Sequence, residues 1–129
     1  MRLEPQQSSN SPNILASTFT IEVEGRLIQL DADGYLVDPG DWSAAFCQQM
    51  AENDGVTLTD DHWLLIDFLH RFYKEYGLAP ELPILSRNLC KDQNDCRWTR
   101  KYIKQLFPDG ARTACRYAGL PAPVGKSCV

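Results

Sequence analysis

The feature that most constrains the fold is an amphipathic stretch in the middle of the chain, between Thr59 and Gly77. Its apolar residues recur in steps of three and four, at Leu65, Ile66, Leu69, Phe72, Tyr73 and Tyr76. That spacing predicts a long helix with one apolar face. Threonine is a favourable N-cap and glycine a frequent helix terminator, so the ends of the stretch agree with its periodicity. A chain of 129 residues can bury one core around such a helix, which indicates a single domain.

Before this helix, the pattern changes to a period of two. Residues 19–23 alternate apolar and polar side chains, Glu24-Gly25 is typical of a tight turn, and residues 26–30 alternate again. A second turn at 31–34 leads into a short third strand at 35–37. We therefore expect a small antiparallel meander, which needs helices over its apolar face to be stable.

Four further helices are predicted around the central one. The first begins at Asp38-Pro39 and ends at Asn53-Asp54-Gly55, and the others cover residues 84–89, 95–106 and 111–118. The predicted fold class is α+β, mostly α: the N-terminal β-meander packs on a bundle of about five helices. We expect residues 1–17 to be a disordered segment, 18–118 to be the domain, and 119–129 to be a flexible C-terminal arm.

The net charge of −4 conceals two halves of opposite sign. Residues 1–85 carry four basic and fourteen acidic side chains, a net of −10, whereas residues 86–129 carry nine basic and three acidic, a net of +6. The acidity of the whole chain argues against general nucleic-acid binding. Positive charge in the C-terminal half would favour the thiolate form of a nearby cysteine.

The five cysteines are an odd set without a CxxC pair, at positions 47, 90, 96, 115 and 128. We expect free thiols, with Cys47 a structural one at the edge of its helix's apolar face. A zinc site made from Cys90, Cys96 and either His62 or His70 is conceivable, but the five-residue gap and the missing second pair argue against it. No metal and no cofactor are expected.

The C-terminal residues bear on function most directly. Gly119 and two prolines end the helix that carries Cys115, and the chain then reaches a penultimate cysteine, Cys128. A thiol on a short arm can enter a partner's active site or fold back to Cys115. This arrangement indicates a swinging sulfur carrier, in which a Cys115–Cys128 link forms and breaks readily rather than acting as a staple.

Several ordered motifs resemble one known family over residues 19–129. They are Tyr35-Leu36-Val37-Asp38-Pro39 with Asp41-Trp42, Leu58-Thr59-Asp60-Asp61-His62-Trp63, Tyr76-Gly77-Leu78-Ala79-Pro80, Leu106-Phe107-Pro108-Asp109-Gly110, and the run from Cys115 to Pro123. Together they are similar to the DsrC/TusE/RspA family of sulfur-carrier proteins. Lys126-Ser127 makes the spacing between Cys115 and Cys128 two residues longer than is usual in that family.

The resemblance implies that Cys128 is the sulfur-carrying thiol. Members with only that cysteine resemble TusE, which relays persulfide sulfur toward 2-thiouridine in tRNA. Members that also have the upstream cysteine, here Cys115, resemble DsrC, in which both cysteines hold a sulfur atom as a trisulfide in concert with dissimilatory sulfite reductase. With both cysteines present, the DsrC-like function is the main interpretation and the TusE-like relay the alternative.

The partners implied are therefore protein sulfur donors and acceptors: dissimilatory sulfite reductase or relay proteins of the Tus and Dsr types. The chain would be a carrier or co-substrate rather than a stand-alone enzyme. Arg116, Arg112 and Arg87 are candidates for stabilising a thiolate or binding anionic sulfur species, with solvated surface as the equally open alternative.

The sequence also bears on two other classes of function. The predicted helices at 95–106 and 111–118 form a basic helix-turn-helix-like pair, which leaves a DNA-binding regulator as a further alternative although the sequence pI is near 5.1. A hydrolase or transferase would need a nucleophile with a positioned base, and no such pattern is visible. Without a secretory signal or a long apolar stretch, we expect a cytoplasmic protein without membrane insertion.

Overall fold

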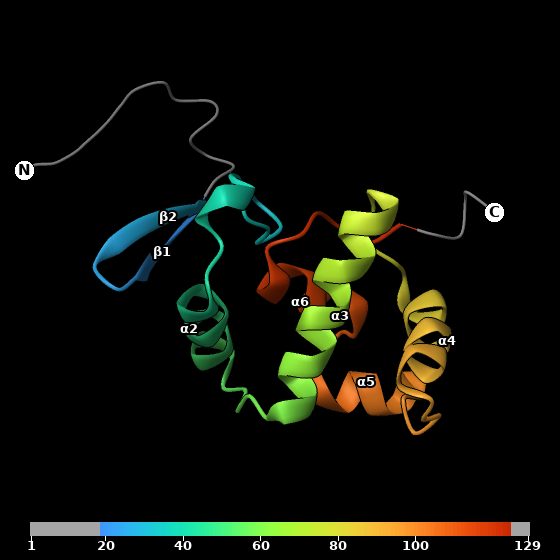
Figure 1. The fold of residues 1–129 in the computed structure, drawn as a ribbon. Coiled ribbons are helices and arrows are strands. Elements are labelled where there is room, and N and C mark those ends of the chain that lie inside the picture. The colour runs from blue at the N-terminus through green and yellow to red at the C-terminus, as the bar shows by residue number, and fades with distance from the viewer. Residues whose placement is uncertain (1–18, 125–129) are drawn as a thin grey trace, which may run out of the picture.

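Helix α3, Asp60–Tyr76, runs through the middle of the fold (Figure 1). The computed structural model describes residues 19–124. The helix begins after Thr59, whose backbone N–H donates to His62 Nδ1 at 3.0 Å, a role more often taken by Glu or Gln at that position. It ends at Gly77, which adopts the left-handed conformation with φ of 74°. Both predicted ends of the central helix are confirmed.

The N-terminal sheet is a two-stranded antiparallel hairpin within the described residues. Strand β1, Phe19–Val23, pairs with β2, Arg26–Leu30, with Phe19 opposite Leu30 and Val23 opposite Arg26. Glu24 and Gly25 have φ of 52° and 81°, as a two-residue hairpin turn requires. The predicted third strand at 35–37 is wrong: it is reduced to one bridge between Leu30 and Leu36.

The segment after the hairpin forms two short elements where one helix was expected from Asp38. A 3-10 helix, η1, covers Pro39–Asp41, and its N-cap Asp38 accepts from the Gly40 N–H at 2.9 Å. Trp42 then has an extended backbone, and helix α2, Ala44–Asp54, starts after Ser43. The prediction missed this interruption because Trp42 has the spacing of a helical apolar residue. Its indole N–H instead bonds to the Tyr117 carbonyl, a long-range contact.

The C-terminal half contains three helices, two of which differ from the predicted bounds. Helix α4 covers Leu82–Gln93 rather than 84–89. The apolar pattern stops at Leu89, but the helix continues through a polar last turn until Asn94, with φ of 51°, ends it. Helix α5 covers Arg100–Leu106 rather than 95–106, because Thr99 is the N-cap and accepts from the Tyr102 N–H at 3.1 Å. Helix α6, Ala111–Ala118, has the predicted bounds.

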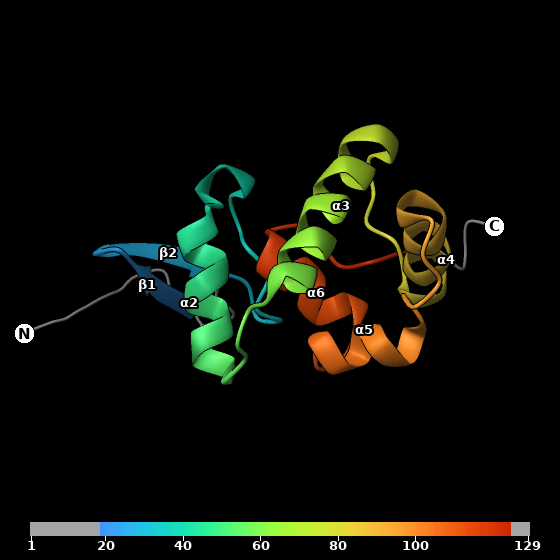
Figure 2. The ribbon, with the colours of Figure 1, turned by 60° about the horizontal axis from the view of Figure 1, so that its bottom comes forward.

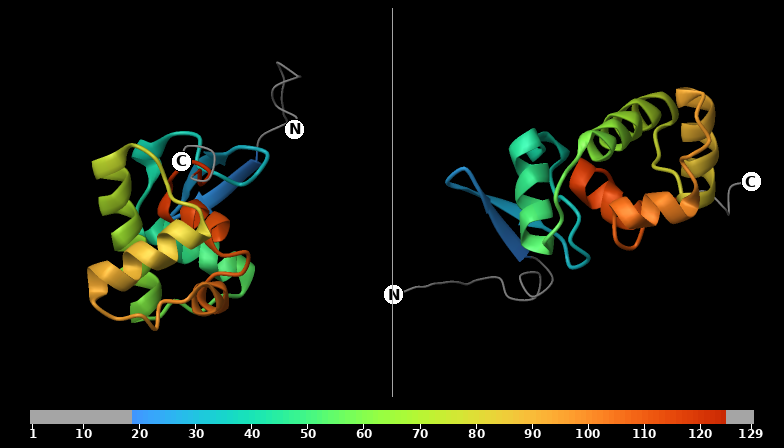
Figure 3. Two further views of the ribbon diagram at one scale, coloured as in Figure 1. Left: turned by 90° about the vertical axis from the view of Figure 1, so that its right-hand side faces the viewer. Right: turned by 90° about the horizontal axis from the view of Figure 1, so that it is seen from below.

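Helices α3 and α6 occupy the centre of the fold, with the hairpin and α2 at one end and α4 and α5 at the other (Figures 1 and 2). Viewed from below, α5 lies between α6 and α4 (Figure 3). The core is continuous through these elements, and its largest fully buried side chains are Trp98, Tyr117, Phe46 and Phe107. The α+β, mostly helical class is confirmed, and the arrangement places α6 where contacts from α2, α3 and the hairpin side meet.

Candidate functional site

The candidate site is built on helix α6. A left-handed turn precedes it, in which Asp109 and Gly110 have φ of 71° and 62° and the Gly110 N–H donates to the Phe107 carbonyl at 2.7 Å. Six of its eight residues are buried: Ala111, Thr113, Ala114, Cys115, Tyr117 and Ala118. The remaining two, Arg112 and Arg116, are one turn apart and therefore lie on the same face of the helix.

Two side chains from distant segments hold the C-terminal end of α6. The Trp42 indole N–H donates to the Tyr117 carbonyl at 2.8 Å, and His70 Nε2–H donates to the Ala118 carbonyl at 2.8 Å. The two rings also pack edge to face, with centroids 4.5 Å apart. Because the last carbonyls of a helix lack partners within it, these bonds satisfy groups that would otherwise be left unpaired.

Gly119 completes this helix end. Its φ is 73°, and a Cβ atom at this position would lie 2.6 Å from Trp42 Cδ1, so both conformation and space require glycine. The next residue, Leu120, is buried, and its N–H donates to the Cys115 carbonyl at 3.0 Å. The direction in which the chain leaves α6 is thus fixed by packing.

The described part of the expected arm lies against the domain. Leu120 and Pro123 are buried, and the Val124 N–H donates to the Ala79 carbonyl at 2.8 Å. A parallel bridge joins Val124 to Pro80 in the connector between α3 and α4. Residues 119–124 therefore form a packed base, and any free segment begins after this contact.

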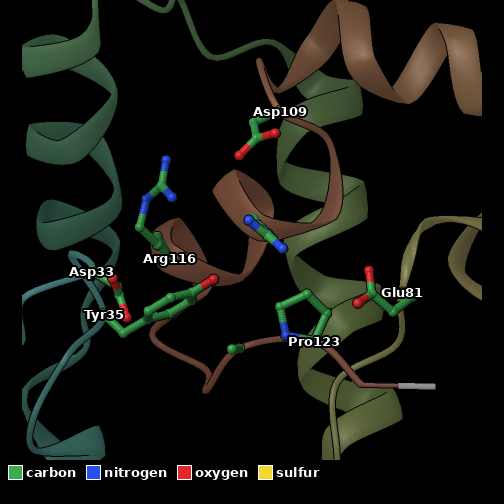
Figure 4. A pocket seen from close by; sticks show the side chains of 8 residues that line it. Asp33, Tyr35, Glu81, Asp109, Arg116 and Pro123 are labelled. Carbon is green, nitrogen blue, oxygen red and sulfur yellow. The ribbon is translucent and has the colours of Figure 1, made fainter. Parts of the chain in front are cut away.

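A pocket of about 350 Å³ opens beside this base (Figure 4). Its lining comes from four parts of the chain and comprises Asp33, Tyr35, Glu81, Asp109, Arg112, Arg116, Ala122 and Pro123. Figure 4 shows Tyr35 and Arg116 on one side, Glu81 on the other, and Pro123 between them. The pocket thus lies directly next to the last described residues.

Two arginines and a phenol give the pocket its hydrogen-bond donors. Arg116 donates to Thr113 Oγ1 at 2.8 Å, and within residues 19–124 neither Arg112 nor Arg116 forms a salt bridge, unlike Arg26, Arg71 and Arg97. Burial raises the pKa of Tyr35, so its hydroxyl stays protonated and able to donate. The arrangement can hold a small anionic group, while the three carboxylates of the lining limit how much negative charge it accepts.

Cys115 lies under this pocket and is completely buried. Burial raises the pKa of its thiol to about 12, Glu81 adds to that effect, and Arg116 opposes it. The expected gain in thiolate from the basic half of the chain is therefore wrong at this position, because desolvation outweighs the arginine. In the described conformation Cys115 is a protonated core thiol.

The structure brings together three of the five predicted site residues. Cys115, Arg112 and Arg116 all belong to α6, with both arginines in the pocket. Arg87 lies apart from them, exposed on α4. Cys128, the central residue of the predicted site, lies outside the described residues.

Sequence reasoning missed the pocket's other polar residues, Asp33, Tyr35, Glu81 and Asp109. Tyr35 and Asp109 lie inside motifs that carried the family resemblance, so the motifs held the available signal. These motifs carry the family resemblance, and nothing in the sequence brings positions 35 and 109 into one pocket.

The histidines and α6 are used structurally. His62 is buried and donates from Nε2 to the Leu106 carbonyl at 2.7 Å, and burial lowers its pKa. Six of the eight residues of α6 are buried and only Arg112 and Arg116 lie on its outer face, which argues against α6 as a DNA-reading helix. Among the described residues, no helix is long and apolar enough to cross a membrane.

The remaining cysteines divide into two kinds. Cys47 is buried in α2, as predicted, and burial raises its pKa to about 12. Cys90 and Cys96 are joined as a disulfide, so the expectation of free thiols is wrong for this pair. The prediction failed because the six-residue spacing matches no familiar motif and because their proximity depends on how α4 ends.

With this geometry established, comparison with known proteins gives a consistent result. The family model described as DsrC like protein matches residues 22–129. The chain is 39% identical over 105 residues to the sulfurtransferase TusE of Yersinia pestis, covering 81% of this chain and 96% of that protein. It is 34% identical over 102 residues to TusE of Escherichia coli strain K12, covering 78% and 94% of the two chains.

Solved structures extend the similarity to the fold. The NMR structure of Allochromatium vinosum DsrC superposes with a TM-score of 0.76 at 40% identity, covering 84% of this chain and 98% of that one. The crystal structure of the oxidised gamma-subunit of dissimilatory sulfite reductase (DsrC) from Archaeoglobus fulgidus has a TM-score of 0.72 at 34% identity, covering 83% and 98%.

Proposed function

The chain belongs to the DsrC-like family of sulfur carriers, and on that premise we propose that it is a TusE-type relay protein that carries sulfur on Cys128 alone. The dissimilatory interpretation was favoured by the sequence because Cys115 is present. The curated relatives, which are named sulfurtransferase TusE, support the relay instead.

The observation that carries the proposal is the burial of Cys115. A thiol with a pKa of about 12 and no exposed surface is almost entirely protonated near pH 7, and no donor can reach it. The working thiol must then be the other family cysteine, Cys128. A two-cysteine mechanism would require the end of α6, held by Trp42 and His70, to open first.

The proposed transfer is an exchange between sulfur atoms. The Cys128 thiolate attacks the terminal sulfur of a donor persulfide, R–S–SH, and forms the new S–S bond. The old S–S bond breaks, and R–S⁻ leaves with its electron pair, so that Cys128 holds the persulfide without any net oxidation or reduction. The acceptor protein's nucleophile then repeats the exchange on the Cys128 persulfide.

The pocket supplies a place for the loaded group. Cys128 is the fourth residue after Val124. The covalent chain therefore limits the distance between the Val124 and Cys128 Cα atoms to about 14 Å. Because Val124 is held at Ala79, this limit includes the pocket next to Pro123. We propose that Arg112, Arg116 and the Tyr35 hydroxyl receive the anionic persulfide between donor and acceptor.

The dissimilatory function is the second candidate. Cys115 is present at the base of the arm, and the DsrC structures from two organisms share this fold at 34–40% identity. In that mechanism, the Cys115 thiolate would attack Cys128 Sγ, the outer sulfur would leave as hydrosulfide with the S–S electron pair, and a Cys115–Cys128 disulfide would remain. The dissimilatory function becomes the better account if the end of α6 is found to open when Cys128 receives sulfur.

The test is intact-mass measurement after incubation with glutathione persulfide, on the wild type and on Cys128→Ser, Cys115→Ser and Cys47→Ser. We expect a gain of one sulfur, located at Cys128 by peptide mapping, in every form except Cys128→Ser. Cys47→Ser is the matched control for Cys115→Ser, since both remove a buried thiol. No sulfur at Cys128 in the wild type, or sulfur at Cys128 that is lost in Cys115→Ser but kept in Cys47→Ser, would contradict the proposal.

A further inference from the structure

A second pair of cysteines lies at the corner between α4 and α5, away from α6. Cys90, in the last turn of α4, and Cys96, in the segment before α5, form a disulfide with Cα atoms 4.4 Å apart. Cys90 is half-buried and Cys96 is exposed. One sulfur of the pair is thus on a residue that solvent reaches, and the other is on a residue partly covered by the helix end.

The end of α4 turns the chain back so that Cys96 returns to Cys90. Asn94 adopts the left-handed conformation, and its N–H donates to the Lys91 carbonyl at 3.2 Å. The next residue, Asp95, donates from its N–H to the Cys90 carbonyl at 3.0 Å. These backbone bonds form a typical helix-terminating motif, which places the two cysteines close together without help from the sulfur atoms.

Contacts on the other side of Cys96 fix the segment further. Arg97 pairs with Asp61 at the start of α3 at 2.6 Å and with Asp95 at 2.7 Å. The Ser86 hydroxyl donates to the Trp98 carbonyl at 2.7 Å, which ties the same segment to α4. Because noncovalent contacts hold both flanks of Cys96, we expect the segment to keep its place when the disulfide is reduced.

From this geometry we propose that Cys90 and Cys96 form a reversible thiol–disulfide exchange site whose substrates are small thiols and disulfides. Its function does not rest on the sulfur-carrying proposal, since neither Cys115 nor Cys128 takes part. The backbone bonds that bring the pair together do not involve sulfur, so we expect the two cysteines to stay close after reduction, while the exposed Cys96 gives small thiols access in both directions. A structural staple would instead be expected where the bond itself holds the segments.

The reaction consists of two exchanges. An external thiolate, RS⁻, attacks the sulfur of the exposed Cys96, and the S–S electron pair leaves with Cys90 as a thiolate, giving a Cys96–S–S–R mixed disulfide. A second RS⁻ attacks the sulfur of R, which releases the Cys96 thiolate and RSSR. Two thiols are oxidised to one disulfide while the protein disulfide is reduced to two thiols, and an excess of RSSR runs the sequence backwards.

The test uses the native full-length chain equilibrated across ratios of reduced to oxidised glutathione, from both the oxidised and the reduced side. After acid quenching and alkylation, peptide mapping measures the fraction of Cys90 and Cys96 in the disulfide. We expect one midpoint within the glutathione range, the same from both directions, with the circular dichroism spectrum unchanged across it. A disulfide that resists reduced glutathione until the chain is denatured would overturn the proposal, as would a pair that stays reduced in oxidised glutathione.

Two variants test which sulfur is attacked. With one cysteine removed, the mixed disulfide with glutathione cannot resolve and accumulates. We expect at least ten-fold faster glutathione incorporation at Cys96 in Cys90→Ser than at Cys90 in Cys96→Ser. Equal rates, or faster incorporation at Cys90, would contradict the assignment of Cys96 as the entry point. In both variants, sulfur loading on Cys128 serves as the control, and it should be unaffected.

Discussion

Cys115 and Cys96 belong to the same small domain, but their surroundings differ in every respect that governs thiol chemistry. Cys115 is fully buried on a helix whose end is held by side chains from two distant segments. Cys96 is exposed on a segment held by surface ion pairs and by the end of α4. The cysteine that carries the family resemblance is closed to solvent in this conformation, and the one outside the family pattern is accessible.

The comparison teaches that a cysteine's role depends on what holds the backbone around it. At α6, buried hydrogen bonds and close packing make a rigid mount from which the C-terminal residues leave in a fixed direction. At the corner between α4 and α5, contacts near the surface keep Cys90 and Cys96 together and leave Cys96 open to solvent. The same residue type therefore serves packing in one place and chemistry in the other.

The largest expected effect comes from adding one carbon at Gly119. In Gly119→Ala, the left-handed φ costs about 1–2 kcal/mol and the steric clash with Trp42 costs about 1–3 kcal/mol more. The free energy of unfolding should therefore fall by about 2–5 kcal/mol. Gly77→Ala is the matched control: its φ is 74°, but nothing lies within 4 Å of the added carbon. Urea unfolding measures both. Equal losses in the two variants would show that Trp42 does not pack against this helix end.

High pH should destabilise the folded protein through its buried thiols, Cys47 and Cys115. Burial raises the pKa of Cys47 and Cys115 from 9.0 to about 12, so in the folded state both stay protonated at a pH where the unfolded chain has already lost these protons. Stability is therefore lost as pH rises above 9.

At pH 10 the two thiols together should lower the free energy of unfolding by about 2–3 kcal/mol relative to pH 8. The measurement is urea unfolding in the presence of reductant. Cys47→Ala should reduce the pH-dependent loss by about half, whatever its effect on stability at pH 8. A wild type that is equally stable at pH 8 and pH 10 would be inconsistent with buried, protonated thiols.

A smaller effect is expected from the hydrogen bond at the end of α6. Trp42→Phe keeps an aromatic ring in place but leaves the Tyr117 carbonyl without its donor, at a cost of about 1–2 kcal/mol. Trp63→Phe is a suitable control, because this half-buried tryptophan has no indole hydrogen bond within the described residues. If the control loses as much stability as Trp42→Phe, the bond to Tyr117 contributes nothing beyond packing.

The sequence predicted elements that have strong local signals at both ends. Helix α6 is bounded by Gly110 and Gly119 and was predicted with its observed bounds, and α3 between Thr59 and Gly77 likewise. Helix α5 was started too early because Trp98 has helical spacing to Tyr102, whereas its carbonyl is in fact bonded to Ser86. Tertiary contacts of this kind cannot be predicted from the spacing of apolar residues along the chain.

The candidate site shows the same division. Arg112 and Arg116 could be found from their four-residue spacing on one helix. The depth of Cys115 could not, because an amphipathic pattern places a residue on the inner face without saying how much covers it. Tyr35 and Glu81 enter the pocket only through the long-range packing of the hairpin side and the α3–α4 connector around α6.

The most direct test of the central claim is to load Cys128 with sulfur and ask whether Cys115 responds. Wild-type chain treated with glutathione persulfide and freed of excess reagent would be followed for released sulfide and, by peptide mapping, for a Cys115–Cys128 disulfide. If Cys128 works alone, neither product forms, and the persulfide persists until an added acceptor thiol takes its outer sulfur. Sulfide released in equal amount to a Cys115–Cys128 disulfide would contradict the account and establish two-cysteine chemistry.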